Sequence, residues 1–366
     1  MDKRIAYFIS PHGFGHAARA SAVMASIRET DPDFRFEIFT TVPEWFFKES
    51  VGDGFTYHSL LTDIGLVQTT PLCANLPETV SQLDRFIPFQ GRIIEQTTER
   101  LARSDCQMVI CDISPMGIAA AKKAGLPSVL VENFTWDWVY AEYITDHDGL
   151  KGHAEYLGTL FSEADYHVQT QPVCSPADVD LTVSPVSRKT RNRGSDVRQR
   201  LGIPENAKLL LMTMGGVPED YGFMENLRLP KDLYLVIPGS NRPFNIQNQR
   251  ISLPHRSEFF HPDLIAAADG VIGKIGYSTL AEVYHGGAPF GFIKRSHFKE
   301  SDILAEYIEK HMSGFAIEEG RLECGDWLNQ VPRLLNIPRI QRKDPNGADQ
   351  IARFVEKGAK SLIDLS

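Results

Sequence analysis

Residues 273–294 carry the side-chain types and spacing best suited to chemistry in this chain. An apolar run ending in glycine precedes a predicted helix that opens with Gly276, Ser278 and Thr279. A glycine-lined helix start binds anions through free N–H groups and the helix dipole. Glu282, one turn further on, can accept hydrogen bonds from two vicinal hydroxyls, so diphosphate plus ribose is the economical ligand. The alternative is an ordinary crossover helix capped by Ser278 or Thr279, with Glu282 in solvent.

Two histidines lie in a glycine-rich turn near the N-terminus, within residues 11–16 (PHGFGH). Imidazole is the usual general base near neutral pH, so His12 and His16 are candidates for proton transfer. Gly13 and Gly15 would let the backbone approach a ligand closely. The residues leave open which histidine acts, and His16 could instead cap or pack beneath the following helix.

Asp112 ends a buried apolar run at residues 107–111. Open α/β sheets bind ligands at the carboxyl ends of their strands, so Asp112 would face the same site as the histidines and could orient one of them. An equally good alternative is that Asp112 caps the helix beginning near Pro115. The polar and aromatic cluster after the next strand adds Asn133 and Asp137 as acceptor-side candidates.

Two successions of strands and helices must position these residues. The sequence predicts strands over 5–10, 34–41, 107–111 and 127–131 in the first half, and over 208–214, 233–237, 251–253 and 290–293 in the second. Helical patterns alternate with them, which predicts two α/β domains with doubly wound parallel sheets. We expect domains over residues 1–175 and 196–345, a linker over 176–195, and a closing helix within 346–366.

Composition sets limits on the class of protein. A length of 366 residues suits two domains, and the net charge of −9 argues against a nucleic-acid partner. The five cysteines are scattered without a CxxC pair, which favours a reducing cytoplasm over a disulfide framework or a zinc site. No window approaches the roughly 20 apolar residues of a membrane span. We therefore expect a soluble cytoplasmic protein, a monomer or homodimer, without an integral membrane segment.

Together these motifs resemble the GT-B glycosyltransferases, whose two Rossmann-like domains face a cleft. Residues 276–289 fit the pattern GxxTxxExxxxGxP of the MurG-like and UDP-glycosyltransferase-like donor site. The nearest resemblance is to the glycosyltransferase-like N-terminal region of plant-type L-arabinokinases and its free-standing bacterial relatives. It rests on HGFGHAAR, NFTWDWVYAEY, RLGIP with LLLMTMGG, and GKIGYSTLAE, and it covers about residues 5–310. The kinase half is absent, so kinase activity is not implied.

The resemblance implies roles for the matching residues. His16 would act as the base near the acceptor, and Asp112 would orient it. The phosphate-binding glycines would be Gly215, Gly216 and Gly276, with Ser278 and Thr279 at the helix start. Glu282 would bind the ribose, and the remaining donor contacts would be Phe260 and His261 for the base and Arg295 and Glu300 for the sugar. Gly13 and Gly15 of the first glycine loop are further candidates for binding the ligand. The Asp/Glu-Gln pair usual after the last strand is replaced by HFKES, which leaves the donor sugar open.

The activity implied is sugar transfer from a nucleotide diphosphate sugar, a UDP-sugar favoured, to the hydroxyl of an unidentified acceptor. Inversion at the anomeric carbon is expected, with neither a metal nor a tightly bound cofactor. Two alternatives stay open: a non-catalytic nucleotide-sugar-binding protein on the same fold, and a sugar-nucleotide epimerase.

Overall fold

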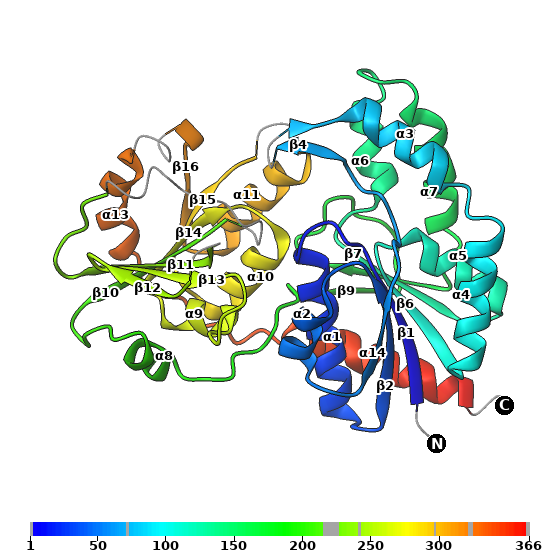
Figure 1. The fold of residues 1–366 in the computed structure, drawn as a ribbon, viewed down its shortest axis with the longest axis horizontal. Coiled ribbons are helices and arrows are strands. Elements are labelled where there is room, and N and C mark those ends of the chain that lie inside the picture. The colour runs from blue at the N-terminus through cyan, green and yellow to red at the C-terminus, as the bar shows by residue number, and fades with distance from the viewer. Residues whose placement is uncertain are drawn as a thin grey trace. The chain divides into compact units, whose positions relative to one another are not determined.

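The computed structural model describes residues 3–70, 73–214, 227–240, 243–295, 298–320 and 325–363 (Figure 1). The chain divides into two compact units. The first comprises Met1–Arg188 and Pro345–Ser366, and the second comprises Lys189–Asp344. Each unit is built on one large sheet with helices packed against it, as the alternation of strands and helices predicts.

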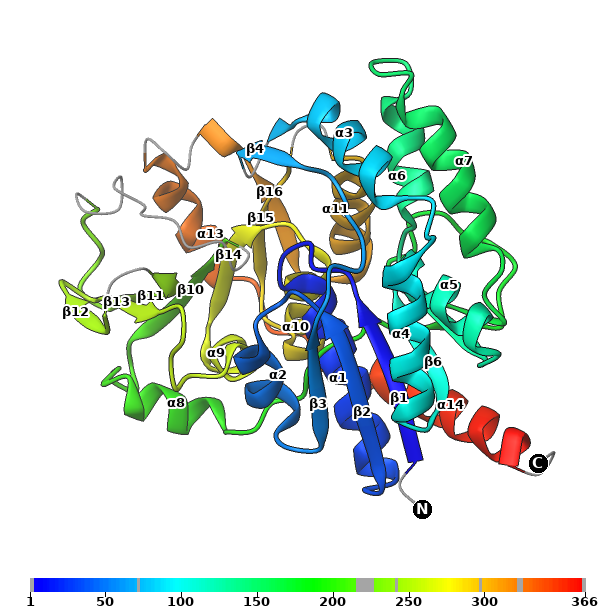
Figure 2. The same cartoon turned by 45° about the vertical axis from the view of Figure 1, so that its right-hand side comes forward.

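In the described part of the first unit, seven parallel strands form a sheet in the order β3-β2-β1-β6-β7-β8-β9, and Figure 2 shows β3, β2, β1 and β6 side by side. The strands are β1 (Lys3–Ile9), β2 (Phe34–Thr40), β3 (Phe55–Ser59), β6 (Cys106–Asp112), β7 (Ser128–Glu132), β8 (Tyr166–Thr170) and β9 (Leu181–Val183). A separate small antiparallel pair joins β4 (Gln68–Thr70) to β5 (Cys73–Ala74). The strand order reverses between β1 and β6, and this switch point is where open α/β sheets bind ligands.

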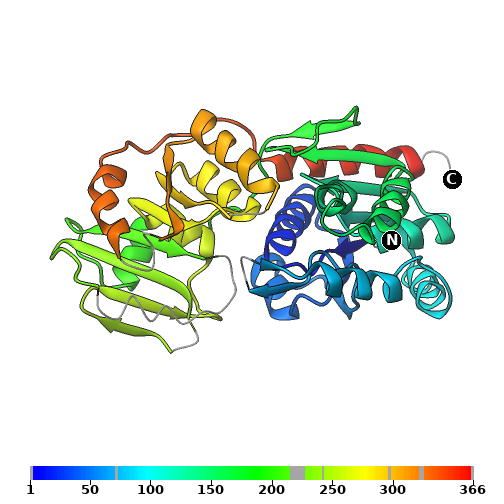
Figure 3. The same cartoon turned by 90° about the horizontal axis from the view of Figure 1, so that it is seen from above.

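Helices pack against this sheet in two groups. One group holds α1 (Gly15–Thr30), α2 (Glu44–Val51) and α14 (Gly347–Ile363). Helix α14 is the red helix in Figure 3. The other holds α4 (Arg92–Arg103), α5 (Pro115–Ala124) and α7 (Leu150–Phe161). The remaining helices of this unit are α3 (Leu76–Phe86) and α6 (Trp136–Tyr143).

Helix α1 is buried on nearly all sides, because it contacts both the sheet and α14. Its small residues make this possible: Ala17 and Ala20 are fully buried, and Ser21 is too. The closing helix at the C-terminus belongs to the first unit, since α14 packs on α1 and Ser26 donates a hydrogen bond to Asp349 at 2.8 Å.

The described residues of the second unit also form a seven-stranded sheet, in the order β12-β13-β11-β10-β14-β15-β16. Its strands are β10 (Lys208–Thr213), β11 (Leu233–Ser240), β12 (Asn245–Gln247), β13 (Arg250–Pro254), β14 (Gly270–Lys274), β15 (Phe290–Ile293) and β16 (Gly314–Ile317). Only the edge strand β12 is antiparallel to its neighbour within these residues. The order reverses between β10 and β14, which defines a second switch point.

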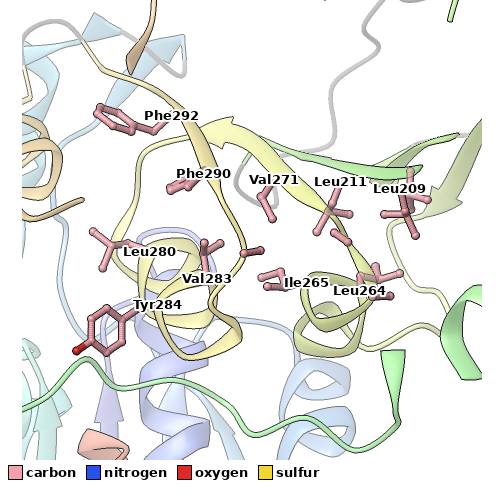
Figure 4. Close-up of a cluster of buried hydrophobic side chains, with 14 of the residues drawn as sticks. Leu209, Leu211, Leu264, Ile265, Val271, Leu280, Val283, Tyr284, Phe290 and Phe292 are labelled. Carbon is pink, nitrogen blue, oxygen red and sulfur yellow. The ribbon is translucent and has the colours of Figure 1, made fainter. Parts of the chain in front are cut away.

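The helices of the second unit are α8 (Gly194–Arg200), α9 (His261–Ala267), α10 (Tyr277–Gly286), α11 (Glu300–His311), the 3-10 turn η2 (Asp326–Gln330) and α13 (Val331–Leu335). Figure 4 shows how α9 and α10 pack on the sheet, with Leu264 and Leu280 directed toward the strand side chains. Both side chains are fully buried, and burial of each contributes about 1.5–3 kcal/mol. This packing fixes α9 and α10 on the sheet beside the second switch point.

The structure adds detail at two places that the sequence analysis considered. The range 176–195, expected to be a linker, contains β9, which pairs with β8 at the edge of the first sheet, and the start of α8. The triplet at 181–183 (LTV) is too short to show periodicity. Helix α10 has Gly276 as its N-cap with no side-chain cap, so neither Ser278 nor Thr279 caps it.

Within the described ranges, no helix is long and apolar enough to cross a membrane.

Candidate active site

The first switch point brings His16 and Asp112 into contact. His16 lies in the first turn of α1, and Asp112 is the last residue of the neighbouring strand β6. Nδ1 of His16 is 2.8 Å from Oδ1 of Asp112, and both side chains are buried. The contact expected between these two residues is therefore present, and the alternative in which Asp112 caps α5 is not, because Ser114 is the N-cap of that helix and it has no side-chain cap.

Nδ1 of His16 lies nearer to Oδ1 of Asp112, at 2.8 Å, than to an NH2 of Arg19, at 3.3 Å. A carboxylate can only accept hydrogen bonds, so with Asp112 as its partner Nδ1 of His16 carries the proton. In the neutral ring Nε2 then has no proton and is the basic atom. This is the tautomer that a general base requires.

Arg19 holds the other side of the Asp112 carboxylate. Nε of Arg19 donates to Oδ2 at 2.8 Å and an NH2 donates to Oδ1 at 2.6 Å, a bidentate ion pair with both side chains almost fully buried. Burial alone would raise the pKa of Asp112. The charge and hydrogen bonds of Arg19, with the hydrogen bond from His16, outweigh burial and hold that pKa below its usual value.

Arg19 also ties Asp112 to the next two strands of the sheet. Its NH1 donates to Oδ1 of Asn133, just after β7, at 2.6 Å and lies 3.4 Å from the hydroxyl of Thr170 at the end of β8. Sequence reasoning did not assign Arg19 a role. The available signal was its position three residues after His16, which places both side chains on one face of a helix.

Aromatic rings surround the two histidines. His12 meets the ring of Trp136 edge-on, with centroids 5.4 Å apart, and His16 meets Phe134 edge-on at 6.1 Å. His16 contacts a carboxylate, whereas His12 lies against an indole. Asp137, held as an acceptor-side candidate with Asn133, instead lies against Gly158 of α7.

Asp63 is a second buried acid near the first switch point. Its Oδ1 accepts a hydrogen bond from Ser10 at 3.1 Å and its Oδ2 accepts one from the indole N–H of Trp136 at 3.3 Å. Burial raises the pKa of Asp63 to about 7, the two hydrogen bonds oppose that rise, and the charge of Asp112 adds to it. Sequence reasoning missed Asp63, because it lies in a loop after β3 that shows no motif.

In the second unit, the start of α10 is the expected anion site. Gly276 has extended backbone as the N-cap, Ser278 is half-buried and Thr279 is buried. The N-cap residue Gly276 has no side chain to supply a capping oxygen to the first N–H groups. The helix ends at glycines, with Gly287 in the left-handed conformation.

Glu282 of α10 is buried and bonded to His261. Nδ1 of His261 lies 2.7 Å from Oε2 of Glu282, and Nε2 lies 3.1 Å from the hydroxyl of Thr213 at the end of β10. Glu282 is therefore not the solvated surface residue of the alternative interpretation. Strands β10 and β14 approach each other closely beside this contact, since a Cβ at Gly273 would lie 2.1 Å from the carbonyl oxygen of Thr213.

The other predicted donor residues have partners within the second unit. The buried ring of Phe260 is covered by the guanidinium of Arg191 at 4.0 Å. Arg295 stacks on Phe298 at 3.4 Å and lies 3.9 Å from the carboxylate of Glu300. The structure thus places Arg295 and Glu300 together.

The predicted glycines are only partly described. Gly13 is exposed with a φ of +72°, and Gly15 is the first residue of α1. Gly215 and Gly216, together with His297 of the HFKES segment, lie outside the described residues. Among the residues that the structure does describe, no group of three or more His, Cys, Asp or Glu side chains is arranged to hold a metal ion.

Solved structures similar to this chain are GT-B glycosyltransferases. CalG4, the calicheamicin glycosyltransferase, matches with a TM-score of 0.61 and 13% identity over 99% of this chain and 95% of its own. MurG of Acinetobacter baumannii matches at 0.56 and 14%, covering 97% and 99%. A UDP-glucosyltransferase from Polygonum tinctorium matches at 0.59 and 12%, covering 99% of each chain. The chain therefore shares the GT-B fold with these proteins.

Two curated relatives agree with the resemblance indicated by the motifs. L-arabinokinase of Arabidopsis thaliana is 27% identical over 365 residues, which are 97% of this chain and 34% of that protein. This chain therefore spans about a third of that relative's length. An uncharacterised glycosyltransferase of Methanopyrus kandleri is 22% identical over 276 residues, covering 72% of this chain and 78% of the relative. No protein-family model matches the chain.

Proposed function

We propose that the protein transfers a glycosyl group from a nucleotide diphosphate sugar, a UDP-sugar favoured, to an acceptor hydroxyl. The contact between His16 and Asp112 carries this proposal, because it would orient His16 as a base at the edge of the first sheet where such sheets bind ligands. The fold shared with a UDP-glucosyltransferase supports the choice of donor. The fold and the relatives do not favour the alternatives of a binding protein or an epimerase.

In the proposed reaction, Nε2 of His16 accepts the proton of the acceptor hydroxyl. The oxygen forms a bond to the anomeric carbon while the bond from that carbon to the diphosphate breaks, and the nucleotide leaves with the electron pair. A direct displacement of this kind inverts the anomeric centre. Asp112 keeps its negative charge because Arg19 holds its pKa low, so it can stabilise the imidazolium that forms.

The second unit would hold the donor. The N–H groups and dipole at the start of α10, at Gly276, Ser278 and Thr279, would bind the diphosphate. Glu282 would bind the ribose, Phe260 and His261 would lie near the base, and Arg295 and Glu300 near the sugar. Charge on the leaving group would be stabilised by these backbone groups, so we propose that no metal is required. The remaining assignments of Gly13, Gly15, Gly215 and Gly216, the cytoplasmic location and the oligomeric state stay predictions.

A thermal-shift screen against UDP, GDP, ADP, CMP and TDP tests the donor site. A ligand at about 100 times its Kd stabilises the folded protein by roughly 2.7 kcal/mol, which should raise the Tm by several degrees. We expect a shift with one nucleotide, lost in Glu282→Ala and kept in Glu306→Ala, a carboxylate on the surface of α11 that pairs with Lys310. No shift with any of the nucleotides would contradict the proposal.

A further inference from the structure

His261 occupies a junction of three elements at the carboxyl edge of the second sheet. It is the first residue of α9, and it reaches Glu282 in α10 and Thr213 at the end of β10. Helix α9 contacts both α10 and β10, so the ring spans elements that already pack together. The resemblance to known enzymes assigned His261 to the neighbourhood of the base, whereas the structure places its ring on the Glu282 carboxylate.

The two ring nitrogens have distinct partners. Because a carboxylate only accepts hydrogen bonds, Nδ1 of His261 donates to Oε2 of Glu282 at 2.7 Å. In the neutral ring Nε2 then accepts a hydrogen bond from the Thr213 hydroxyl at 3.1 Å. Both ring nitrogens are satisfied, and the ring has one orientation.

The Glu282 carboxylate is buried and in contact with His261. The side chain of Glu282 is 3% exposed and that of His261 is 24% exposed. A buried carboxylate needs a donor to offset the water it loses, and the direction of that donor fixes its orientation. The start of α9 is itself anchored, since Asp263 accepts hydrogen bonds from the backbone N–H of Arg191 and the side chain of Asn192, both at 2.7 Å.

We propose that His261 is a positioning residue for the donor, which fixes the Glu282 carboxylate for recognition of the ribose hydroxyls by linking it to Thr213. The inference rests on the proposed function, because it assumes that Glu282 binds ribose. It adds that discrimination between ribose and deoxyribose depends on a side chain that need not touch the sugar. It also predicts that the preference for ribose over deoxyribose requires the hydrogen bond from Nδ1 of His261, and not only a side chain of that size.

Calorimetric titration of the full chain with UDP and 2′-deoxy-UDP tests the role, with ADP and GDP and their 2′-deoxy forms as further pairs. We expect the wild type to prefer the ribonucleotide by roughly ten- to a hundredfold, the range for a hydrogen bond to a charged group. His261→Ala should bring the ratio of the ribonucleotide and deoxynucleotide affinities most of the way to one, whatever its effect on the affinity for either. His261→Asn should retain it, because its amide N–H takes the place of Nδ1, while His261→Gln, whose amide takes the place of Nε2, should not.

The outcomes separate the two proposals. If the wild type and His261→Ala show the same preference for ribose, or if Gln rescues it and Asn does not, the positioning role is wrong while the donor site stands. If Glu282→Ala keeps the preference, or the wild type binds no nucleotide, both proposals fall. In the Glu282→Ala background, His261→Ala should cause no further change in the ratio of the two affinities, and a further loss would contradict action through Glu282.

Discussion

The guanidinium of Arg19 donates to both oxygens of Asp112, at 2.8 and 2.6 Å, in a pair that is almost completely shielded from water. The same carboxylate accepts the hydrogen bond of His16, so one acid serves two cationic or potentially cationic partners. Two charges in a buried site are tolerated only while they are paired and hydrogen-bonded. The buried carboxylate of Asp112 therefore needs Arg19 in order to stay charged while it accepts the hydrogen bond from His16.

Removing Arg19 should destabilise the protein strongly. Arg19→Met leaves the Asp112 carboxylate buried without its counter-charge, and we expect a loss of about 3–5 kcal/mol in the free energy of unfolding, measured by urea denaturation. The matched control is Arg103→Met on the surface of α4, where the pair with Glu99 is exposed, and which should cost at most about 0.5 kcal/mol. Arg19→Met combined with Asp112→Asn should recover part of the loss, and strict additivity of the two changes would contradict this account.

His16 and His12 should differ in their effect on turnover. With His16→Ala we expect release of nucleotide from the donor in the presence of acceptor to fall by two to four orders of magnitude, since the base is removed. Nucleotide affinity should stay unchanged, because the side chains proposed to bind the nucleotide belong to the second unit. His12→Ala is the control, because His12 lies in the same turn and packs edge-on against Trp136, and its effect should be far smaller. Equal losses in the two variants would refute the assignment of His16 as the base.

Asp63 should make stability depend on pH in a defined direction. Its pKa rises from an ordinary value of 3.8 to about 7 in the fold, so the folded state binds its proton more tightly than the unfolded chain does. Stability from this group is full below pH 3.8, declines as pH rises, and has been lost above pH 7, a change of about 4 kcal/mol at most.

Comparison with Asp63→Asn isolates that contribution, because all other titrating groups cancel. The stability of the variant relative to the wild type should increase between pH 5 and pH 8 in urea denaturation. Asp165→Asn is a useful contrast, since Asp165 is exposed and accepts hydrogen bonds from the backbone and hydroxyl of Ser128. A pH-independent difference for Asp63→Asn would show that Asp63 is already ionised at pH 5.

Much of the fold could be predicted because strands covered on both faces read as continuous apolar runs. The strand at 290–293 is matched at both ends, and the helix before it ends at the predicted glycines. The contact between His16 and Asp112 could be predicted for a related reason. Both follow the carboxyl ends of strands, and adjacent parallel strands bring those ends to one edge.

Other contacts depend on how the strands and helices pack in three dimensions, which the spacing of residues along the sequence does not determine. Arg19 reaches three partners from β6, β7 and β8, which requires the register of all three strands. Asp63 comes from an irregular loop, and the link from His261 to Glu282 depends on how α9 packs against α10. A rule based on residue type alone can also mislead. Ser278 is a good capping residue in isolation, but Gly276, two residues earlier, is the N-cap.

Gly287 and Gly125 offer a matched test of what limits glycine substitution. Both follow helices in the left-handed conformation, with φ of +68° and +67°, so Ala at either position costs about 1–2 kcal/mol in backbone strain. A Cβ at Gly125 would meet nothing within 4 Å, whereas at Gly287 it would lie 1.8 Å from the carbonyl oxygen of Ile340, a backbone atom that cannot move aside as a side chain can. That approach is stabilised by the hydrogen bond from the N–H of Ile340 to the carbonyl of Gly287 at 2.9 Å.

Gly287→Ala should therefore lower the free energy of unfolding by roughly 3 kcal/mol or more, and Gly125→Ala by the strain alone. Equal losses in urea denaturation would show that the segment around Ile340 gives way at little cost, and that backbone conformation alone governs both sites.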